Sequence, residues 1–332
     1  MMKLETAVPQ RIHEVGQRAN QEDNTYPDSE RMSRVYILCD GMGGHAHGEV
    51  ASRIVCTTMG EWMETHRKPD DPFGWEQFDK ALFAAYDALD AADDIDDGKK
   101  MGTTMTFLLF HANGVSAAHI GDSRIYQLRP ASGGQPASIL FRTRDHSLVN
   151  DLVRLGEMTE EEARTAPNRN IITRAMQPHQ ARRARADLKL LTDVKAGDYF
   201  YLCSDGMTEQ MDDAELLALI TDPGLTDTEK REELVRRTAR NKDNHTAFLI
   251  RVTEAEGTAA ADPDTPPMEV SLCREEAPQR PAPRAMKLPQ AIRKQRKADG
   301  KHPSLWRILI PVFIAALLLL ALAIVKFWTK NT

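Results

Sequence analysis

Three short apolar runs lie close together between residues 104 and 128, and they constrain the possible folds more than any other part of the sequence. The runs at 104–110, 115–120 and 124–128 are rich in β-branched or aromatic residues, with turn residues such as HANG at 111–114 between them. Strands joined by such short turns pair antiparallel, because a parallel pair needs a long crossover connection. The pattern predicts a layered α+β architecture and argues against a doubly wound nucleotide-binding fold.

The spacing of apolar residues predicts the other elements. Runs at 35–39, 188–191, 199–203 and 247–252 favour strands. Apolar residues recur three and four positions apart at 50–65, 73–92, 148–155, 212–220 and 228–241, which predicts helices. Together these elements form a body that ends near residue 255.

Residues 308–325, with the sequence ILIPVFIAALLLLALAIV, carry no charge and lie between Arg307 and Lys326. A buried core helix would show a polar face, whereas this segment is apolar all round, so we expect one transmembrane helix over 305–328 and a short tail at 329–332. Basic residues gather before the segment, and the positive-inside bias then places the preceding chain in the cytoplasm. The expected location is a cell membrane, crossed once.

Residues 256–304 hold eight of the eighteen prolines and show little apolar periodicity, so we expect a flexible, basic linker. The net charge of the whole chain is −6, but residues 274–332 are strongly basic. Residues 1–273 therefore carry a net charge of about −15. So acidic a body is unsuited to nucleic acid, because phosphate backbones require basic surface. The basic end of the linker could lie on anionic lipid headgroups or serve only as solvated charge.

The cysteines and the first residues favour a reducing compartment. The four cysteines are scattered without close pairing, and MMKLETAVPQ contains no apolar run typical of a signal peptide. We expect free thiols and a cytosolic body.

Acidic residues stand at the ends of three predicted strands and in two small polar segments. They are Glu22, Asp23, Asp40, Asp122, Asp205 and Asp243. A single aspartate at a strand end is usually a cap or turn former. If the fold brings these acids together, their carboxylates repel and protonate unless a divalent cation joins them, and oxygen ligands suit magnesium or manganese.

The segment LCDGMGGHAHGE at 38–49 suggests other sites that its spacing disfavours. GMGG lacks the G-x-G-x-x-G pattern, and no lysine follows it as in a phosphate-binding loop. His45 and His47 are two positions apart, and no closed tetrahedral set of ligands lies nearby for zinc. Gly41 is better explained by a backbone that turns its carbonyl toward a metal or its water.

Eight segments together resemble the metal-dependent type-2C Ser/Thr protein phosphatases in their bacterial form. In the family's order across 16–250 they are GQRANQED, DGMGGHAHGEVAS, GTTMTFLLF, HIGDSRIYQL, DHSLVNDLVRLGEM, NRNIITRAM, SDGMTEQM and NKDNHTAFLI. The resemblance implies a hydrolase acting on phosphoserine and phosphothreonine, with residues 1–255 as catalytic domain. It also implies an α+β fold: a four-layer αββα sandwich of two antiparallel β-sheets flanked by helices.

The resemblance assigns roles to residues of this chain. The implied metal ligands are Glu22, which would bind through metal-held water, Asp23, Asp40, the carbonyl of Gly41, Asp122, Asp205 and Asp243. They would hold two Mn²⁺ or Mg²⁺ ions, with Asp122 and Asp205 at a third, weaker site. The implied catalytic residues are Arg18, which grips the substrate phosphate, and Asp40 and Asp205. A water bridging the two ions would attack phosphorus as hydroxide.

The sequence departs from the family pattern at three positions. Met42 stands where animal members carry the histidine proposed to protonate the leaving group. The general acid is therefore unassigned, with His45, His47 and a metal-bound water as candidates. Ala166 and Gln177 replace a frequent histidine and a usual glycine in and beside a flap-like segment at 145–176.

Several residues near these motifs favour structural roles. Cys39 and Cys203 lie in apolar runs and are expected to be small buried strand residues. Arg124 and Arg174 are expected to brace loops against acids. The arginines of QARRARAD, at 180–187, favour a solvated loop face.

Two classes of function remain open. One is a membrane-tethered phosphatase whose counterpart, inferred from the family alone, is a eukaryotic-like Ser/Thr kinase together with its phosphorylated protein substrates. The other is a catalytically silent module that binds phosphopeptides or scaffolds a membrane complex, but degenerate members should lack Asp40, Asp205 or Asp243, and all three are present. A sporulation-type phosphatase with one dedicated substrate differs only in specificity.

Overall fold

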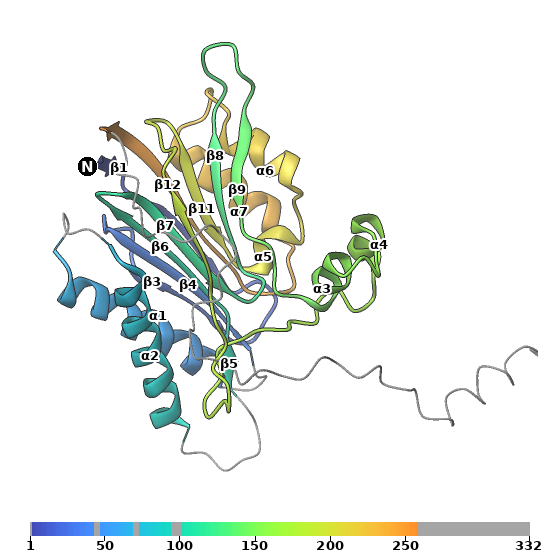
Figure 1. Ribbon diagram of the computed structural model, residues 1–332. Helices are drawn as coiled ribbons and strands as arrows, with labels where there is room; N and C mark the ends of the chain where they lie inside the picture. Colours follow the sequence, from blue (N-terminus) through green and yellow to red (C-terminus); the bar gives the residue numbers. More distant parts are fainter. Residues whose placement is uncertain (1, 43–46, 69–72, 94–100, 258–332) are drawn as a thin grey trace, which may run out of the picture. The chain divides into compact units, whose positions relative to one another are not determined.

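The structure is a computed structural model that describes residues 2–42, 47–68, 73–93 and 101–257 (Figure 1). The linker beyond Gly257, the apolar segment at 308–325 and the tail, with the predicted boundaries between them, lie outside the described residues. Among the helices within the described ranges, none is both long and apolar enough to cross a membrane.

The described strands form two six-stranded antiparallel sheets (Figure 1). Sheet one has the order β1 (Lys3–Thr6), β12 (His245–Glu256), β11 (Tyr199–Cys203), β8 (Arg124–Arg129) and β9 (Ser138–Arg142), with β2 (Gln10–Glu14) also on β12. Sheet two has the order β10 (Asp187–Leu191), β7 (Gly114–Ile120), β6 (Met105–His111), β4 (Val35–Met42) and β3 (Asp23–Tyr26), with β5 (Gly102–Thr103) also on β4.

The three apolar runs between 104 and 128 do not all pair with one another. The first two form the antiparallel hairpin β6–β7, as predicted. The third, β8, pairs with β9 and β11 in the other sheet. The prediction was wrong for this strand because Gly121, with φ of +105°, turns the chain out of sheet two instead of back along it. The turn places Asp122 at the junction of the two sheets.

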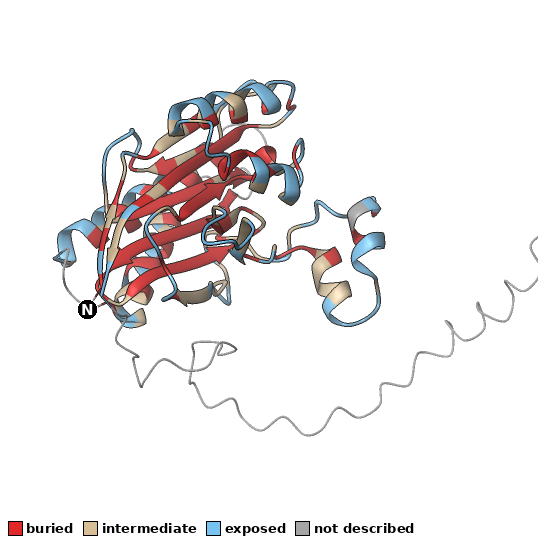
Figure 2. Cartoon of the chain, turned by 90° about the horizontal axis from the view of Figure 1, so that it is seen from above, coloured by how far each residue is buried: buried red, intermediate tan, exposed pale blue. Residues whose placement is uncertain are grey.

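Successive residues of the central strands belong to different cores. On β4, Tyr36 packs with Phe200 and Phe248 between the sheets, whereas Ile37 packs on the outer side with Met59. Neighbouring side chains of a strand point to opposite faces, so a strand that is apolar at every position must be covered on both sides. Figure 2 shows the buried residues concentrated in the sheets and the exposed ones on the outer helices.

Helices cover the outer faces of both sheets. The long helices α1 (Gly48–His66) and α2 (Trp75–Ala92) enclose the core of sheet two, and α6 (Asp213–Ile220) and α7 (Asp227–Thr238) enclose that of sheet one. Capping boxes start α6 at Asp212 and α7 at Thr226, where each side chain accepts a bond from a free backbone N–H group. This confirms the predicted architecture of two antiparallel sheets flanked by helices.

The apolar pattern does not predict every element. It misses the short strands β1, β2 and β5, the polar strand β3 with the sequence DNTY, and β9, which is only partly buried at the edge of sheet one. It also misses the short helices α4 (Glu160–Thr165) and α5 (Asp205–Thr208). With α3 (Leu148–Arg154), α4 forms the flap, which we define as residues 145–176.

Candidate metal centre

The predicted acids converge, although they come from both sheets. Asp23 begins β3 and lies directly opposite Asp40 on β4. Asp122 follows β7, Asp205 begins α5 after β11, and Asp243 precedes β12. The charges of Asp23, Asp205, Asp122 and Asp243 all act on Asp40. The structure thus gathers these five acids, hereafter the acid cluster, into one group.

The carboxyl groups of the acid cluster have strongly perturbed protonation. Burial, reinforced by the neighbouring carboxylates, raises the pKa of Asp40 well above its usual range. Burial likewise raises the pKa of Asp23 and of Asp122 to about 7, and that of Asp205 to about 6. Without a cation, these groups therefore resist ionisation at neutral pH.

Three members of the acid cluster have a buried oxygen that nothing in the described ranges satisfies. These atoms are Oδ1 of Asp23, Asp122 and Asp205. Buried polar atoms are almost always hydrogen-bonded, so three such oxygens in one cluster point to a missing ligand. A set of oxygen donors with excess negative charge fits a hard divalent cation such as Mn²⁺ or Mg²⁺.

Gly41 lies where the backbone leaves no room for a side chain. A Cβ atom there would stand 2.2 Å from the carbonyl oxygen of Gly48 and 2.6 Å from that of Glu22. The Gly41 N–H donates to the same Glu22 carbonyl at 3.1 Å. Close packing of Glu22 against the end of β4 is thus a second reason for a glycine after Asp40.

Arg18 contacts the acid cluster directly. Its Nη2 lies 2.7 Å from Oδ2 of Asp243, and the Arg18 side chain is 54% exposed. Hydrogen bonding to Asp243 raises the pKa of Arg18 further above its usual range. The guanidinium is therefore charged and retains N–H groups that face solvent beside the acids.

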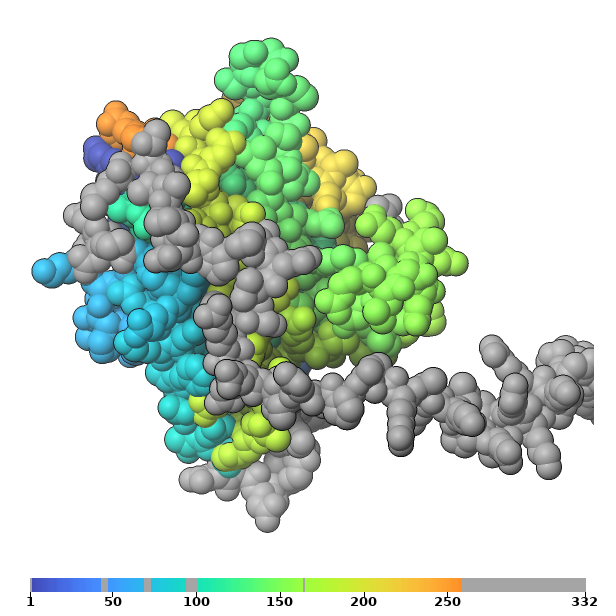
Figure 3. Space-filling view, viewed as in Figure 1, coloured from blue at the N-terminus to red at the C-terminus, as the bar shows by residue number. Residues whose placement is uncertain are grey.

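A cavity of about 650 Å³ lies between the acid cluster and the flap. Its lining includes Asp122 and Asp205 of the acid cluster and Val149 and Ala163 of the flap. The flap helices stand beside the body as the light-green group in Figure 3. A volume of this size accommodates a phosphorylated side chain with part of its peptide.

Sequence reasoning missed three polar residues that hold the acids in place. They are Thr104, Ser204 and Asn244. Thr104 Oγ1 accepts from the Asp40 N–H at 2.9 Å and contacts Ser123 Oγ at 2.7 Å, so it joins β4 to the turn that carries Asp122.

The other two join the N-terminal acids to sheet one. The Ser204 hydroxyl donates to Asp23 Oδ2 at 2.9 Å, and Asn244 Oδ1 accepts from the Glu22 N–H at 2.8 Å. Ser204 and Asn244 are each adjacent in the sequence to a predicted metal ligand, and this adjacency could have indicated their role. Thr104 gives only the weaker signal of a polar residue in an apolar strand.

The departures from the family pattern have different outcomes. Ala166 packs with Val149 and Ala163 in a small core inside the flap, so a small apolar residue fits there. His47 is the N-cap residue of α1, Met42 ends β4, and His45 lies outside the described residues. No general acid is assigned from these positions.

The residues expected to brace loops do so. Arg124 binds Asp145 through two bonds of 2.7 and 2.6 Å, and Arg174 donates to Asp187 at 2.8 Å. Cys39 and Cys203 are fully buried, and burial raises the pKa of both thiols. Cys39, Cys56 and Cys203 are free thiols, as predicted.

The expectation of a solvated loop face at 180–187 was wrong for Arg183. Arg183, in the loop at 180–187, is not a solvated side chain. It donates to Asp87 at 2.6 Å and to Asp90 at 2.8 Å, and its guanidinium lies over the rings of Phe83 and Tyr86. The loop is therefore fastened to α2, whose acids the sequence pattern alone could not assign to it.

Comparison with known proteins agrees with the fold. The family model described as protein phosphatase 2C matches residues 10–243, which is more than half of the chain. The chain belongs to the protein phosphatase 2C family. The structure accordingly presents this family's fold over the described part of the chain.

Two relatives within the protein phosphatase 2C family are similar over most of the described residues. The serine/threonine protein phosphatase PstP of Mycobacterium tuberculosis is 34% identical over 240 residues, which cover 71% of this chain and 43% of PstP. The chain thus spans less than half the length of that relative. The protein phosphatase PhpP of Streptococcus pneumoniae is 34% identical over 249 residues, which cover 73% of this chain and 96% of PhpP.

Solved structures of PstP show the same fold. One crystal structure superposes with a TM-score of 0.62 at 32% identity, covering 76% of this chain and 99% of that one. The PstP catalytic domain in complex with two manganese ions gives a TM-score of 0.58 at 32% identity, covering 76% of this chain and all of that one.

Proposed function

We propose that this chain is a metal-dependent protein serine/threonine phosphatase that hydrolyses phosphoserine and phosphothreonine. The observation that carries the proposal is the acid cluster, in which three buried carboxyl oxygens lack a partner within the described ranges. Relatives named as serine/threonine phosphatases, and a PstP structure with two manganese ions, support it. An array of unpaired acids without a cation would only destabilise the fold.

The proposed ligands divide between two ions and a weaker third one. Asp40, Asp205 and Asp243 hold the pair, and Asp23 and the Gly41 carbonyl complete their surroundings. Glu22 acts through water. Asp122, with Asp205, serves the third site. The raised pKa of Asp122, to which Asp205 contributes after burial, supports this pairing.

The residues then divide the chemistry of phosphoryl transfer. When bound, the cations lower the pKa of a water molecule and neutralise the phosphoryl oxygens. Arg18 presents its exposed N–H groups to the substrate phosphate in a planar fork, beside Asp243. Thr104 fixes the backbone of Asp40 and Ser204 fixes the carboxylate of Asp23, so that the site is organised before substrate binds.

We further propose that residues 305–328 anchor the enzyme in a cell membrane with its catalytic domain in the cytoplasm. The proposal rests on the uninterrupted apolar run at 308–325 and the basic residues before it. A tether of this kind raises the local concentration of membrane-associated phosphoproteins, among them a cognate Ser/Thr kinase and its substrates. Membrane fractionation tests it: the full chain should pellet with membranes, and a chain ending at residue 304 should not.

The enzymatic proposal is tested with the full chain and a phosphothreonine peptide. Mn²⁺ should support release of phosphate, EDTA should abolish it, and Asp205→Asn should reduce the rate by at least about a thousandfold, since it removes a ligand shared by the cations. A folded, Mn²⁺-loaded chain that binds the peptide without turnover would instead identify the silent scaffolding module.

A further inference from the structure

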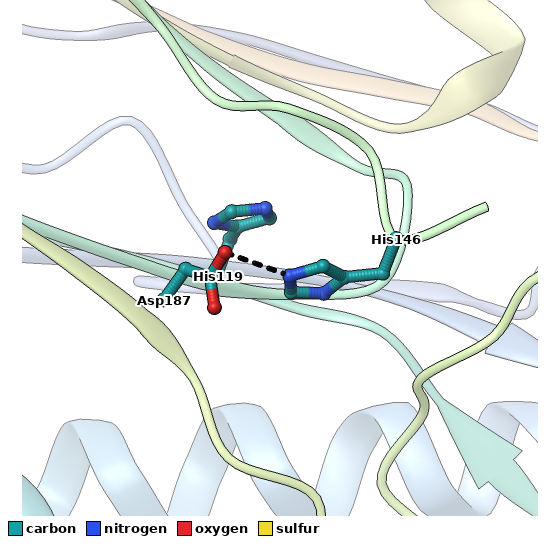
Figure 4. A group of neighbouring side chains, drawn as sticks. All are labelled: His119, His146 and Asp187. Atoms are coloured by element: carbon teal, nitrogen blue, oxygen red, sulfur yellow. Dashed lines mark ion pairs between the residues drawn. The ribbon is translucent and has the colours of Figure 1, made fainter. Parts of the chain in front are cut away.

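His119 on β7, His146 in the flap and Asp187 at the start of β10 form a second group of titratable side chains outside the acid cluster (Figure 4). The two imidazole rings are stacked, with centroids 4.4 Å apart and planes at 12°. His146 Nε2 lies 3.1 Å from Asp187 Oδ2. One potential ligand atom from each residue lies within 4.8 Å of the others, which is close enough to hold a metal ion.

The hydrogen bonds fix the proton positions on both rings. The backbone N–H of Gly121 donates to Nδ1 of His146 at 3.0 Å, and a backbone amide can only donate. Nδ1 of His146 is therefore unprotonated, and Nε2–H donates to Asp187. His119 Nε2 lies 2.9 Å from the carbonyl of Arg144, which can only accept, so that ring also carries its proton on Nε2.

This arrangement opposes metal binding through His146. A neutral imidazole that binds a metal through Nε2 must carry its proton on Nδ1. That proton would face the Gly121 N–H across 3.0 Å, so two donors would oppose each other in a buried site. Nε2 of His146 also lies 3.2 Å from a guanidinium nitrogen of Arg174, so a metal ion bound at Nε2 would meet a further positive charge. The group is better suited to hydrogen bonding than to coordination.

His146 instead joins three segments at the base of the flap. Its backbone N–H donates to the Gly121 carbonyl at 2.9 Å, so ring and backbone together hold both polar groups of Gly121. Its carbonyl accepts from the Thr173 N–H at 2.8 Å, which ties the start of the flap to its end. Asp187 orients the ring and is itself held by Arg174 at 2.8 Å.

The Gly121 contact bears directly on Asp122. Gly121 has φ of +105°, and a Cβ atom there would stand 2.6 Å from Cγ2 of Thr104. On the other side, Ser123 is bonded to Thr104 at 2.7 Å. Asp122 therefore lies between Gly121 and Ser123, which are both held by hydrogen bonds. The bonds to Gly121 come from His146 of the flap.

We propose that His146, protonated on Nε2 and oriented by Asp187, is a positioning residue that holds Asp122 and the base of the flap in fixed relation. This assignment rests on the proposed phosphatase function, because it gives Asp122 and the adjoining cavity their role. The flap and the third metal site are then structurally coupled. A displacement of the flap would move Asp122, and a displacement of Asp122 would move the flap, through the contact between Gly121 and His146.

The proton positions can be measured without turnover. In the full chain labelled with ¹⁵N-histidine and glycine, the His146 signals should show a bare Nδ1, and the Gly121 amide should exchange slowly with solvent. A protonated Nδ1 would overturn the proposal. So would displacement of the His119 and His146 signals by stoichiometric Zn²⁺, which would establish a metal site instead. These measurements involve no substrate. An inactive enzyme would therefore refute the phosphatase proposal, while the proton positions on His146 could still be determined.

Two substitutions separate positioning from mere packing. His146→Asn places an amide oxygen near the former Nδ1 and keeps the acceptor for Gly121, whereas His146→Gln places its amide near Nε2 and loses that acceptor. His146→Gln should speed Gly121 exchange and raise the Mn²⁺ concentration for half-maximal activity by about tenfold, as expected for an unsatisfied buried amide. His146→Asn should restore most of both.

His111 supplies the matched control. It is equally buried, accepts the Asn113 N–H on Nδ1 at 3.3 Å and contacts Ser116 at 2.8 Å. His111→Gln should lower thermal stability and leave the Mn²⁺ requirement unchanged. Equal Mn²⁺ requirements in His146→Asn, His146→Gln and His111→Gln would show that His146 only packs.

Discussion

Arg18 and Asp243 form an ion pair in which Nη2 and Oδ2 are 2.7 Å apart, so the proposed phosphate-binding group touches a proposed metal ligand. A cation bound at Asp243 and a phosphate bound at Arg18 would therefore be neighbours. The cation would neutralise the carboxylate of Asp243, and the phosphate would neutralise the guanidinium of Arg18. Substrate and metal recognition are neighbours in one site.

Arg18→Ala should separate these two roles. The substitution removes the fork that meets the phosphate, so KM for a phosphothreonine peptide should rise at least about tenfold, as for loss of charge-assisted hydrogen bonds. Mn²⁺ affinity, measured by calorimetry, should not fall, because Asp243 loses only a competing partner. Arg236→Ala, which breaks an exposed pair with Glu233 on α7, is the control and should change neither quantity. A weakened Mn²⁺ affinity in Arg18→Ala would contradict this division.

The acid cluster should destabilise the metal-free chain progressively as the pH rises. The pKa values of Asp23 and Asp122 rise to about 7, and that of Asp205 to about 6, whereas the ordinary value is 3.8. Between 3.8 and about 7 these carboxyl groups therefore bind more protons in the folded chain than in the unfolded chain, and their contribution to the free energy of unfolding falls with pH. The imidazoles of His13, His111 and His119, whose pKa values burial lowers to about 4, 3 and 4, contribute in the opposite sense below about 6.5. The slope should reach about 1.4 kcal/mol per pH unit for each excess proton.

Urea unfolding of the EDTA-treated chain across this pH range measures the slope. Saturating Mn²⁺ should remove the contribution of the acid cluster to this slope, because the ionised carboxylates then have a partner, and Asp205→Asn should reduce it. A slope that neither Mn²⁺ nor Asp205→Asn changes would show that the acids are not held under repulsion.

Arg124→Met should be strongly destabilising. The substitution leaves Asp145, whose side chain is only 15% exposed, without either of its two bonds from Arg124. Removing one partner of a largely buried pair costs about 3 kcal/mol or more. Chemical denaturation measures the loss, and the double variant Arg124→Met with Asp145→Asn should recover part of it. Additive losses in the double variant would mean that the two residues act independently.

Gly41→Ala should impair metal binding through the backbone. Its Cβ would meet the Gly48 carbonyl at 2.2 Å, so β4 and the start of α1 must move apart next to Asp40. We expect a loss of Mn²⁺ affinity of about tenfold or more, measured by calorimetry. Gly74→Ala adds the same methyl group where nothing lies within 4 Å, and it should bind Mn²⁺ normally. Equal Mn²⁺ affinities of Gly41→Ala and Gly74→Ala would show that close packing at Gly41 does not support metal binding.

Much of this arrangement could be predicted from the sequence, for identifiable reasons. The central strands are apolar on both faces, so β4, β6 and β11 are evident without a partner. The acids were also evident, because polar residues that interrupt or follow such strands are conspicuous. Their convergence was a hypothesis, since the register of Asp23 opposite Asp40 depends on β3, a strand too polar to recognise.

What could not be predicted depends on long-range contacts. The crossing of β8 into the other sheet depends on the turn at Gly121 and on pairing with β11, a strand far along the chain, and the apolar pattern encodes neither. The pairing of Arg183 with acids of α2 joins segments far apart in the chain. In both cases tertiary packing, not local preference, chose the outcome.

Anomalous diffraction from crystals of the full chain grown with Mn²⁺ tests the central claim most directly. The account predicts two strong manganese peaks within the acid cluster, coordinated by Asp40, Asp205 and Asp243, and a weaker peak near Asp122. A folded chain whose acid side chains turn away from one another, with no manganese between them, would contradict it.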